Sequence, residues 1–358
     1  MSIAENLVDP LWRIQNLYSI KDEATGRSVH FDPRPEQLEV IRHIHEEPDV
    51  PLYIIKSRRL GMSTALGVTM ADSVAFNDGY QASLVEQKQE TAWAKMRNII
   101  RHSVYSLPPG ILESLEFVKA NDGELAIKPA QQDLKDREET KISSAYAGLT
   151  PRGGTINFLW VSEWGVIQHQ DPPRSREIRT GALPAARKGV RVVETTWMGG
   201  KAGDLWELIS PILSNLDGAN GKVLFFPWHG DPSCVRVKGT VSLEIEEYFS
   251  ELSARLNNQF SPDQKRWYAA TAIEQGIFMR REYPSTLDEA FSAPVEGSIY
   301  GNELARAKVE GRITPFIADK SSPVYTCWDL GSLQKHLRLL FPDGAGRGDP
   351  HPGLRRWL

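Results

Sequence analysis

The stretch "KSRRLGMST" (residues 56–64) holds the side chains of this chain best suited to bind a phosphate. A phosphate site needs backbone N–H groups that converge on the anion, a helix N-terminus behind them and a nearby cation. Gly61 permits the tight turn, and Ser63 or Thr64 can place a hydroxyl on Mg²⁺. The common pattern G-x-x-x-x-G-K-[ST] finds Gly61 and Ser63, but it finds Met62 where the lysine belongs. The stretch is therefore either a phosphate loop whose lysine has moved or a basic surface turn.

Three basic side chains could supply the positive charge that Met62 lacks. Lys56 follows the apolar run "PLYII" and can reach over the loop, and Arg58 and Arg59 offer two further charges. We expect the working lysine to be Lys56, at the front of the loop, and Met62 to take no part in catalysis. The candidate nucleotide-binding residues of the loop are Lys56, Ser57, Arg58, Arg59, Leu60, Gly61, Met62, Ser63 and Thr64.

Two further apolar runs end in residues that could act beside the loop. "INFLWVSEW" (156–164) carries Ser162 and Glu163, and a carboxylate at the end of a buried strand can orient the attacking water of a phosphoryl transfer. Ser162 stands where such strands usually carry an aspartate, so it could hold Mg²⁺ only weakly or through a water. "VRVVETTWMGG" (190–200) carries Thr195 and Thr196, whose hydroxyls could sense the γ-phosphate. The plainer alternatives are that Glu163 is a surface glutamate at the end of a strand, and that Thr195 and Thr196 lie in a β-turn after a strand.

A glutamine precedes the loop in the stretch "FDPRPEQLEVI". Gln37 follows a proline turn there, and its amide offers both a donor and an acceptor to the edge of an adenine. Without its context, the residue is better explained as a solvent-facing position on a helix.

The elements that must position these residues are short apolar runs that alternate with helix-like stretches. The runs "LYII", "ASLVE", "ELAIK", "INFLWVS", "VRVVETT" and "KVLFFPW" predict strands, and residues 63–77 and 87–104 predict helices between them. This alternation, from residue 51 to about residue 230, predicts an α/β domain with a largely parallel sheet. Residues 242–256 and 261–275 predict two more helices, the second of which opens with an N-cap serine and a proline.

Composition narrows the class of protein. The length of 358 residues suggests about two domains, and 41% hydrophobic and 25% charged residues are ordinary for a soluble globular protein. A net charge of −4 argues against a small basic nucleic-acid module, although a local basic groove remains compatible with it. The two cysteines, Cys234 and Cys327, are too few and too far apart in sequence for a disulfide framework. Without a signal peptide or a membrane-spanning run, we expect a cytoplasmic protein with no membrane contact.

The order and spacing of these features resemble the large terminase subunit of tailed bacteriophages, the motor that drives DNA into the capsid. The resemblance rests on a glutamine after a proline turn, a loop with its lysine at the start, a strand ending in Ser–Glu, and a strand ending in Thr–Thr–x–x–Gly. The stretches "FFPWHGDP" (225–232) and "FMRREYPSTLDEAFSAP" (278–294) are similar to further stretches of that family. The resemblance covers roughly residues 30 to 332.

The resemblance implies a fold, cofactors and partners. The fold would be an α/β P-loop ATPase of the RecA-like, ASCE type with a mostly parallel central sheet, and the cofactors would be ATP and Mg²⁺. The partners would be double-stranded DNA, the terminase small subunit and the portal protein of the procapsid, in the cytoplasm of a bacterial host. Several copies of the chain would form a ring.

The resemblance also implies a role for each matching residue. Gln37 would contact adenine, Lys56 would contact the phosphates, and Ser63 would bind Mg²⁺. Arg58 would stabilise the transition state and Glu163 would orient the water. Thr195 and Thr196 would couple hydrolysis to motion. Ser162 is the main departure from the family's pattern.

The stretch "VYTCWDLGS" (324–332) resembles the opening strand of the family's nuclease domain, which has a ribonuclease-H-like fold. Asp329 matches the first metal-binding aspartate of that domain. Two-metal cleavage of a phosphodiester needs several carboxylates, whereas the following residues are rich in Gly, Pro and Arg. We therefore expect a truncated nuclease domain without metal-dependent DNA cleavage, followed by a poorly ordered tail of out-of-frame or unrelated sequence.

Five parts are expected along the chain. They are an N-terminal segment with the adenine-contacting motif (1–50), the P-loop ATPase core (51–235), a helical subdomain or linker (236–296), the incomplete start of the nuclease domain (297–332) and the aberrant tail (333–358). Two alternatives to a packaging ATPase stay open: another DNA-dependent P-loop ATPase such as a helicase, and a defective prophage remnant that binds DNA or terminase partners without turnover. Ser162 and the incomplete nuclease favour the second alternative.

Overall fold

The computed structural model describes residues 3–130, 143–148, 155–292, 324–328 and 338–342. The chain divides into two compact units, Met1–Val295 and Glu296–Leu358. In the second unit, β11 (Val324–Trp328) pairs antiparallel with β12 (Arg338–Pro342). β11 confirms the strand predicted near Val324, and β12 forms from the run "RLLFP", inside the segment for which the sequence predicts a tail. Asp329 lies outside the described residues.

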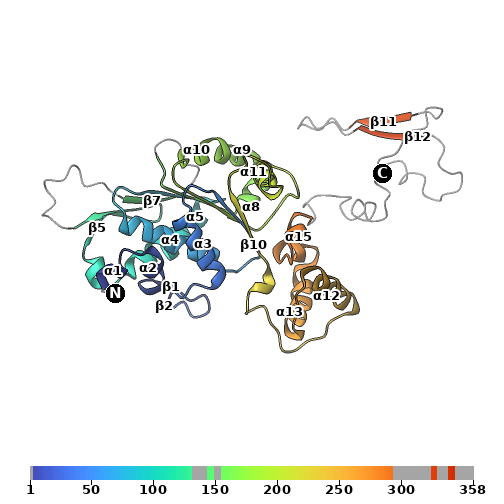
Figure 1. The fold of residues 1–358 in the computed structure, drawn as a ribbon, viewed down its shortest axis with the longest axis horizontal. Coiled ribbons are helices and arrows are strands. Elements are labelled where there is room, and N and C mark those ends of the chain that lie inside the picture. The colour runs from blue at the N-terminus through green and yellow to red at the C-terminus, as the bar shows by residue number, and fades with distance from the viewer. Residues whose placement is uncertain (1–2, 131–142, 149–154, 293–323, 329–337, 343–358) are drawn as a thin grey trace. The chain divides into compact units, whose positions relative to one another are not determined.

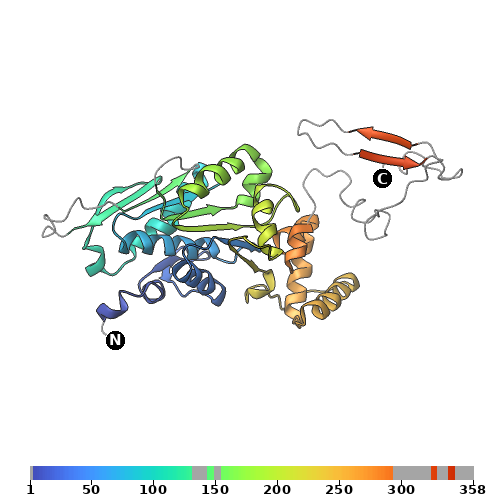
Figure 2. The same ribbon diagram turned by 45° about the horizontal axis from the view of Figure 1, so that its top comes forward.

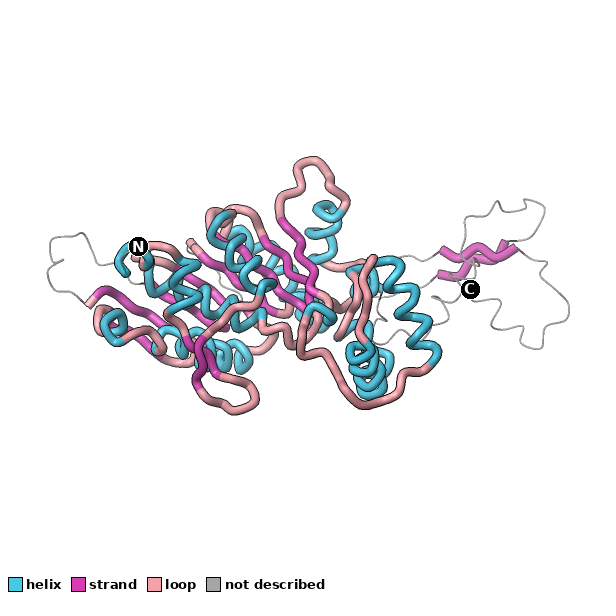
Figure 3. The backbone as a smooth tube through the Cα atoms, turned by 60° about the horizontal axis from the view of Figure 1, so that its bottom comes forward, coloured by secondary structure: helices cyan, strands magenta, loops and turns pink. Residues whose placement is uncertain are grey.

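An eight-stranded sheet forms the centre of the first unit, and Figure 3 shows its strands in magenta with helices on either side. From one edge to the other, the strands are β10 (Lys222–Phe226), β3 (Leu52–Lys56), β9 (Val190–Thr195), β8 (Phe158–Ser162), β4 (Gln81–Val85), β7 (Ser143–Gly148), β6 (Glu124–Pro129) and β5 (Leu115–Ala120). Neighbours from β10 to β7 are parallel, and β6 and β5 add an antiparallel edge. All six predicted strands and the mostly parallel sheet are thereby confirmed. The sequence missed two strands of this sheet, β5 and β7, and the residues of β7 ("SSAYAG") are mostly small with little β propensity.

The central strands are buried on both faces, which explains why their sequences are continuous apolar runs. On β8, Phe158 and Trp160 belong to one hydrophobic core, whereas Leu159 and Val161 belong to the core on the opposite face. This division follows from the strand geometry, because successive side chains point to opposite faces of a sheet.

Helices cover both faces of the sheet (Figures 1 and 2). The first core includes side chains of α2 (Pro10–Asn16), α3 (Pro35–Glu46), α4 (Met62–Phe76) and α5 (Gln89–Lys95), and the second includes side chains of α8 (Trp164–Gln170) and α11 (Asp204–Leu213). The helix predicted over 63–77 is α4. The helix predicted over 87–104 is α5, a π-helical turn (Met96–Ile100) and α6 (Arg101–Tyr105). Other short elements are α1 (Ile3–Asn6), β1 (Ser19–Lys21), β2 (Ser28–His30), α7 (Pro109–Leu112), α9 (Pro172–Glu177), the π-helical turn Ile178–Ala182, α10 (Leu183–Ala185) and the 3-10 turns Trp228–Gly230 and Gly276–Phe278.

The N-terminal segment packs onto α4 through a buried ion pair. Arg13 donates two hydrogen bonds to Asp72, from Nε at 2.9 Å and from Nη2 at 2.7 Å, and the Tyr18 hydroxyl donates a third at 2.9 Å. Asp72 and Tyr18 are fully buried, and Arg13 is only 6% exposed. This segment therefore shares its core with the helix that follows the candidate loop.

A group of helices follows β10 along the chain. It comprises α12 (Leu243–Leu256), α13 (Pro262–Gln275), α14 (Met279–Glu282) and α15 (Leu287–Ser292), and a third core forms around Trp228 with Phe249, Phe260 and Tyr268. α12 and α13 confirm the two predicted helices. The predicted cap of α13 is present, because Ser261 Oγ accepts a hydrogen bond from the Gln264 backbone N–H at 3.2 Å. In the part of the chain that the structure describes, no helix combines the length and the apolar character that a bilayer crossing requires.

Candidate nucleotide-binding site

The stretch from residue 57 to residue 61 connects β3 to α4 in a tight turn. Arg59 and Gly61 both have left-handed backbone, with φ of 64° and 69°. The left-handed backbone favours glycine at residue 61, and a Cβ there would also displace the Gln37 side chain, because it would approach Gln37 Nε2 to 2.7 Å. Because α4 begins at Met62, the unpaired N–H groups of its first turn border the loop, as an anion site requires.

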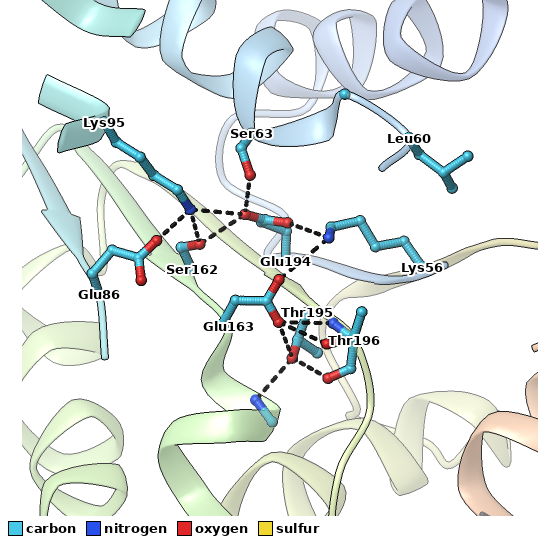
Figure 4. Close-up of polar contacts among 12 residues, drawn as sticks. Lys56, Leu60, Ser63, Glu86, Lys95, Ser162, Glu163, Glu194, Thr195 and Thr196 are labelled. Carbon is cyan, nitrogen blue, oxygen red and sulfur yellow. Dashed lines mark hydrogen bonds and ion pairs between the residues drawn. The ribbon is translucent and has the colours of Figure 1, made fainter. Parts of the chain in front are cut away.

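Lys56 ends β3 and lies between two carboxylates (Figure 4). Its Nζ is 3.3 Å from Glu163 Oε1 and 3.1 Å from Glu194 Oε2, and the residue is 7% exposed. Burial by itself would lower the pKa of the Lys56 ammonium, but Glu194 and then Glu163 outweigh burial and raise it. Lys56 is therefore a permanent positive charge at the start of the loop, as the sequence predicts.

Glu163 follows β8 in a conformation that costs free energy. Its φ of 54° and ψ of 42° are left-handed, which is unusual for a residue other than glycine. Its Oε2 accepts hydrogen bonds from the Thr196 backbone N–H and the Thr196 hydroxyl, both at 3.0 Å, and from Thr195 Oγ1 at 3.4 Å. With its side chain 27% exposed, Glu163 is both fixed in place and accessible to water. The structure thus brings together Lys56, Glu163 and the two threonines that sequence reasoning selected.

Glu194 also belongs to this cluster, although it is not among the residues predicted from the sequence. It is fully buried, and its Oε1 accepts hydrogen bonds from Ser63 Oγ and Ser162 Oγ, each at 2.8 Å. Its Oε2 forms the ion pair with Lys56 and no hydrogen bond. Burial would raise the pKa of this carboxyl, but Lys56, Lys95 and the two hydroxyls lower it to about 2. Glu194 is therefore ionised at neutral pH.

A second lysine extends the cluster away from the loop. Lys95, the last residue of α5, donates to Ser162 Oγ at 2.5 Å, forms an ion pair with Glu86 and lies 3.7 Å from Glu194 Oε1. It also lies over the ring of Trp160, 5.1 Å from the centroid. Nothing in the spacing of Glu86 and Lys95 marks them in the sequence. Glu194 did leave a signal, because it is the one charged residue after the apolar pair in "VVETT".

Gln37 lies directly behind the loop. Its Nε2 donates to the carbonyl oxygens of Gly61 at 3.0 Å and Leu60 at 3.4 Å, and its Oε1 accepts from the backbone N–H of Arg34 at 2.9 Å. Arg34 Nη2 donates to the same Leu60 carbonyl at 2.5 Å. Both ends of the Gln37 amide are thus bonded to protein, and its contact with adenine stays a prediction.

The remaining loop residues have different surroundings. Met62 is 1% exposed and belongs to the first core, which explains why the position that usually carries the lysine is apolar. Arg58 forms an ion pair with Glu282 of α14, and Arg59 lies 3.9 Å from Glu23 in an exposed pair. Ser57 Oγ donates a hydrogen bond to the Pro284 carbonyl at 3.4 Å, and the Thr64 N–H donates one to the Gly61 carbonyl at 3.1 Å. The transition-state role of Arg58 stays a prediction.

A cavity of about 400 Å³ opens beside the loop. Its lining includes Arg58, Arg59, Asp231, Trp267 and Tyr283. Asp231 forms an ion pair with Arg34 at 3.0 Å, which connects this cavity to the residues behind the loop. Aromatic rings beside cations are suited to a nucleoside and its phosphates.

The donors around the loop fit Mg²⁺ by their chemistry. Mg²⁺ prefers oxygen ligands and is usually held by one or two protein groups together with substrate phosphates. Ser63 offers a hydroxyl oxygen, and the Glu194 carboxylate that accepts its hydrogen bond lies in the same cluster. Among the described residues, no group of three or more His, Cys, Asp and Glu side chains could hold a metal ion by itself, so the nucleotide would complete the coordination.

The strand order identifies the class of fold. β9 lies between β3, which leads into the loop, and β8, which leads into Glu163, so the two motifs are separated by one strand. This order is that of an α/β P-loop ATPase fold of the ASCE type with a mostly parallel central sheet. In that fold, one strand is inserted between the strand before the loop, here β3, and the strand before the glutamate, here β8.

Comparison with known proteins finds similar solved structures, whereas no family model and no curated protein matches the chain. The chain is similar to the large terminase ATPase domain of Thermus phage P74-26, with 16% identity and a TM-score of 0.44 over 71% of this chain and 94% of that one. It is similar to the large terminase of bacteriophage HK97 with 15% identity and a TM-score of 0.49, over 80% of this chain and 55% of that one. It is also similar to the large terminase of a thermophilic bacteriophage in complex with ATP-γ-S, with 13% identity and a TM-score of 0.41, over 83% and 61%. The chain thus spans little more than half the length of the last two proteins.

Proposed function

We propose that this chain hydrolyses ATP to drive double-stranded viral DNA into a procapsid, as the ATPase of a terminase large subunit. The observation that carries the proposal is the pairing of Lys56 Nζ with Glu163 Oε1 at 3.3 Å, at the mouth of a glycine-containing loop. A buried cation and a strained, partly exposed carboxylate at this place are the two groups that phosphoryl transfer to water needs.

The contacts of Glu163 explain how it would orient a water. Its Oε2 is held by Thr196, while its Oε1 is bonded to Lys56. When Lys56 turns to the phosphates of ATP, Oε1 is released and can accept a hydrogen bond from the attacking water. Thr196 keeps the carboxylate in position throughout, so the reorganisation on ATP binding is small.

The two threonines would transmit the state of the site to the rest of the domain. Thr195 Oγ1 accepts a hydrogen bond from the Gly165 N–H at 3.0 Å, at the start of α8. A change at Glu163 therefore reaches α8 and the segment after β9 directly. This contact supports the coupling role that the sequence resemblance implies for Thr195 and Thr196.

Charge around the phosphates would be neutralised from three directions. Lys56 lies at the start of the loop, and Arg58 would leave its ion pair with Glu282 to contact the γ-phosphate. Ser63 would hold Mg²⁺, which neutralises part of the charge on the phosphates when it is bound. The nucleoside would occupy the side of the loop bordered by Gln37 and the cavity next to Arg58.

The partners follow from the sequence resemblance. They would be duplex DNA, held mainly through its phosphates and therefore in a salt-dependent way, the terminase small subunit and the portal protein. Copies of the chain would act as a ring on the procapsid in the cytoplasm of the bacterial host.

ATP hydrolysis by the purified chain, with and without linear duplex DNA, tests the proposal. We expect turnover that DNA stimulates, and a loss of at least about 100-fold in Lys56→Ala and Glu163→Ala. Lys128→Ala, which removes a partly exposed lysine of β6, is the control and should retain turnover. Turnover at the wild-type level in both site variants would reject the site.

Two additional measurements separate the alternatives. A chain that binds DNA or terminase partners but shows no hydrolysis under any condition would be the defective remnant. Strand separation of a forked duplex would indicate a helicase. Incubation of the same preparation with plasmid and Mg²⁺ tests the expectation that the chain does not cleave DNA.

A further inference from the structure

The magnesium side of the site has an unusual composition. P-loop ATPases hold Mg²⁺ with the loop Ser or Thr and an aspartate at the end of the neighbouring buried strand. Here that strand, β8, ends in Ser162, which has no charge. The hydroxyl of Ser63 nevertheless donates to a carboxylate at 2.8 Å, and this carboxylate is Glu194 of β9.

The sheet register explains how a residue of another strand reaches this place. Ser162 and Glu194 are direct partners in the parallel pair of β8 and β9. By strand alternation, Glu194 shares the sheet face of Val192, which belongs to the core that includes α4. Ser162 Oγ donates to the same oxygen of Glu194 as Ser63 does, also at 2.8 Å. The Glu194 carboxylate therefore lies within hydrogen-bond distance of both Ser162 and the loop residue Ser63.

We propose that Glu194 is the carboxylate of the Mg²⁺ site and that it replaces, from β9, the acidic residue that β8 lacks. It would keep the Ser63 hydroxyl proton bonded to itself, so that the free lone pairs of Ser63 Oγ face the metal ion. This inference rests on the proposed ATPase function and extends it to a residue outside the loop and the Ser–Glu strand.

The contacts of Glu194 distinguish this role from that of Glu163. Glu194 is 0% exposed and both of its oxygens have protein partners, so it has no direct access to bulk water. Glu163 is 27% exposed and is the carboxylate that a water can reach. The two glutamates therefore have different roles: Glu194 accepts the hydrogen bond of the loop hydroxyl at the Mg²⁺ site, and Glu163 orients the attacking water.

A purely structural role as a counter-charge explains the contacts less completely. Lys56 also has Glu163, and Lys95 also has Glu86, so each lysine has a second carboxylate partner. The bond from Ser63, by contrast, connects Glu194 to the loop residue that the sequence resemblance matches with the Mg²⁺ ligand.

Binding of mant-labelled ATP-γ-S at increasing Mg²⁺ concentrations tests the inference without relying on turnover. For Glu194→Gln we expect the Mg²⁺ concentration of half-maximal binding to rise by at least about tenfold, while binding in EDTA changes little. Asp72→Asn is the matched control, because it also removes a fully buried, ion-paired carboxylate, from the middle of α4. Its Mg²⁺ dependence should equal that of the wild type.

The exchange Ser162→Asp with Glu194→Ser returns the acid to β8 and keeps one acidic residue and one serine in the pair. We expect this double variant to show the Mg²⁺ dependence of the wild type. Circular dichroism shows whether each variant folds, and the double variant tests the inference even if Glu194→Gln does not fold. An unchanged Mg²⁺ dependence in folded Glu194→Gln, or no Mg²⁺ dependence in the folded double variant, would overturn the inference. If the wild type itself bound no nucleotide, the proposed ATPase function would fail first.

Discussion

Replacing Lys56 by methionine removes the charge between two carboxylates and keeps an unbranched side chain of similar length. In the wild type, Lys56 Nζ lies 3.1 Å from Glu194 and 3.3 Å from Glu163, and Glu194 is fully buried. The variant leaves Glu194 with Lys95, whose Nζ is 3.7 Å away. We therefore expect Lys56→Met to lose conformational stability as well as nucleotide binding.

The magnitude follows from the pKa of Glu194. Against the effect of burial, Lys56 first, Lys95 second and then the hydroxyls of Ser162 and Ser63 lower this pKa from an ordinary value of 4.5 to about 2. The net difference of roughly 2.5 units corresponds to about 3 kcal/mol of stability at neutral pH for all these partners together, and Lys56 is the largest of the favourable ones. Breaking a buried ion pair usually costs about 3–5 kcal/mol, which is of the same order. We expect Lys56→Met to lower the free energy of unfolding by about 3 kcal/mol.

The pKa of Glu194 also determines how the free energy of unfolding depends on pH. A carboxyl with a lowered pKa in the folded state contributes its full stability above its unfolded pKa of 4.5, and the contribution disappears as the pH falls toward about 2. By about pH 4 the wild type has lost about 1 kcal/mol of this contribution. The difference in stability between wild type and Lys56→Met should therefore be largest at neutral pH and smaller by about 1 kcal/mol near pH 4.

Urea unfolding followed by tryptophan fluorescence at the two pH values measures this effect, because Trp160 and Trp164 are fully buried on opposite faces of the sheet. Lys128→Met is the matched control. It removes a partly exposed lysine that lies 3.0 Å from Glu116, and a surface pair of this kind contributes less than about 1 kcal/mol. Equal costs for the two variants, or a cost of Lys56→Met that grows as the pH falls, would refute the reasoning.

Three further predictions concern the site and its support. Glu163→Gln should lower hydrolysis by at least about 100-fold while mant-ATP-γ-S still binds, as phosphate release and fluorescence would show; unimpaired hydrolysis would contradict its role. Gly61→Ala should cost about 1 kcal/mol or more in urea unfolding and weaken nucleotide binding, because φ is 69° and a Cβ would approach a side-chain nitrogen to 2.7 Å. Gly110→Ala, where a Cβ meets open space, is its control. Asp72→Asn should cost about 3 kcal/mol in the same assay by leaving Arg13 buried without its partner, and a cost below about 1 kcal/mol would show that the pair contributes little.

Local patterns in the sequence were sufficient for much of the fold. The central parallel strands β3, β4, β8 and β9 are apolar runs because they are buried on both faces, and the partly buried edge strand β10 is also an apolar run, so all five were visible without tertiary information. β7 was not visible, because its pairing with β4 and β6 comes from its neighbours and not from its own small residues. The interruption of the helix over 87–104 by a π-helical turn also left no local signal.

The sequence by itself determined the chemistry that each segment could offer. Lys56, Glu163, Thr195 and Thr196 lie at or just after the ends of apolar runs, and the carboxyl ends of parallel strands meet at one edge of a sheet, so local patterns were enough to select these residues. Only the tertiary structure decided which of them share a site with Glu194. The insertion of β9 between β3 and β8 sets Glu194 beside Ser162 and within 3.1 Å of Lys56. Strand order depends on long-range pairing that no short pattern encodes, and this is why the buried carboxylate behind the loop emerged only from the fold.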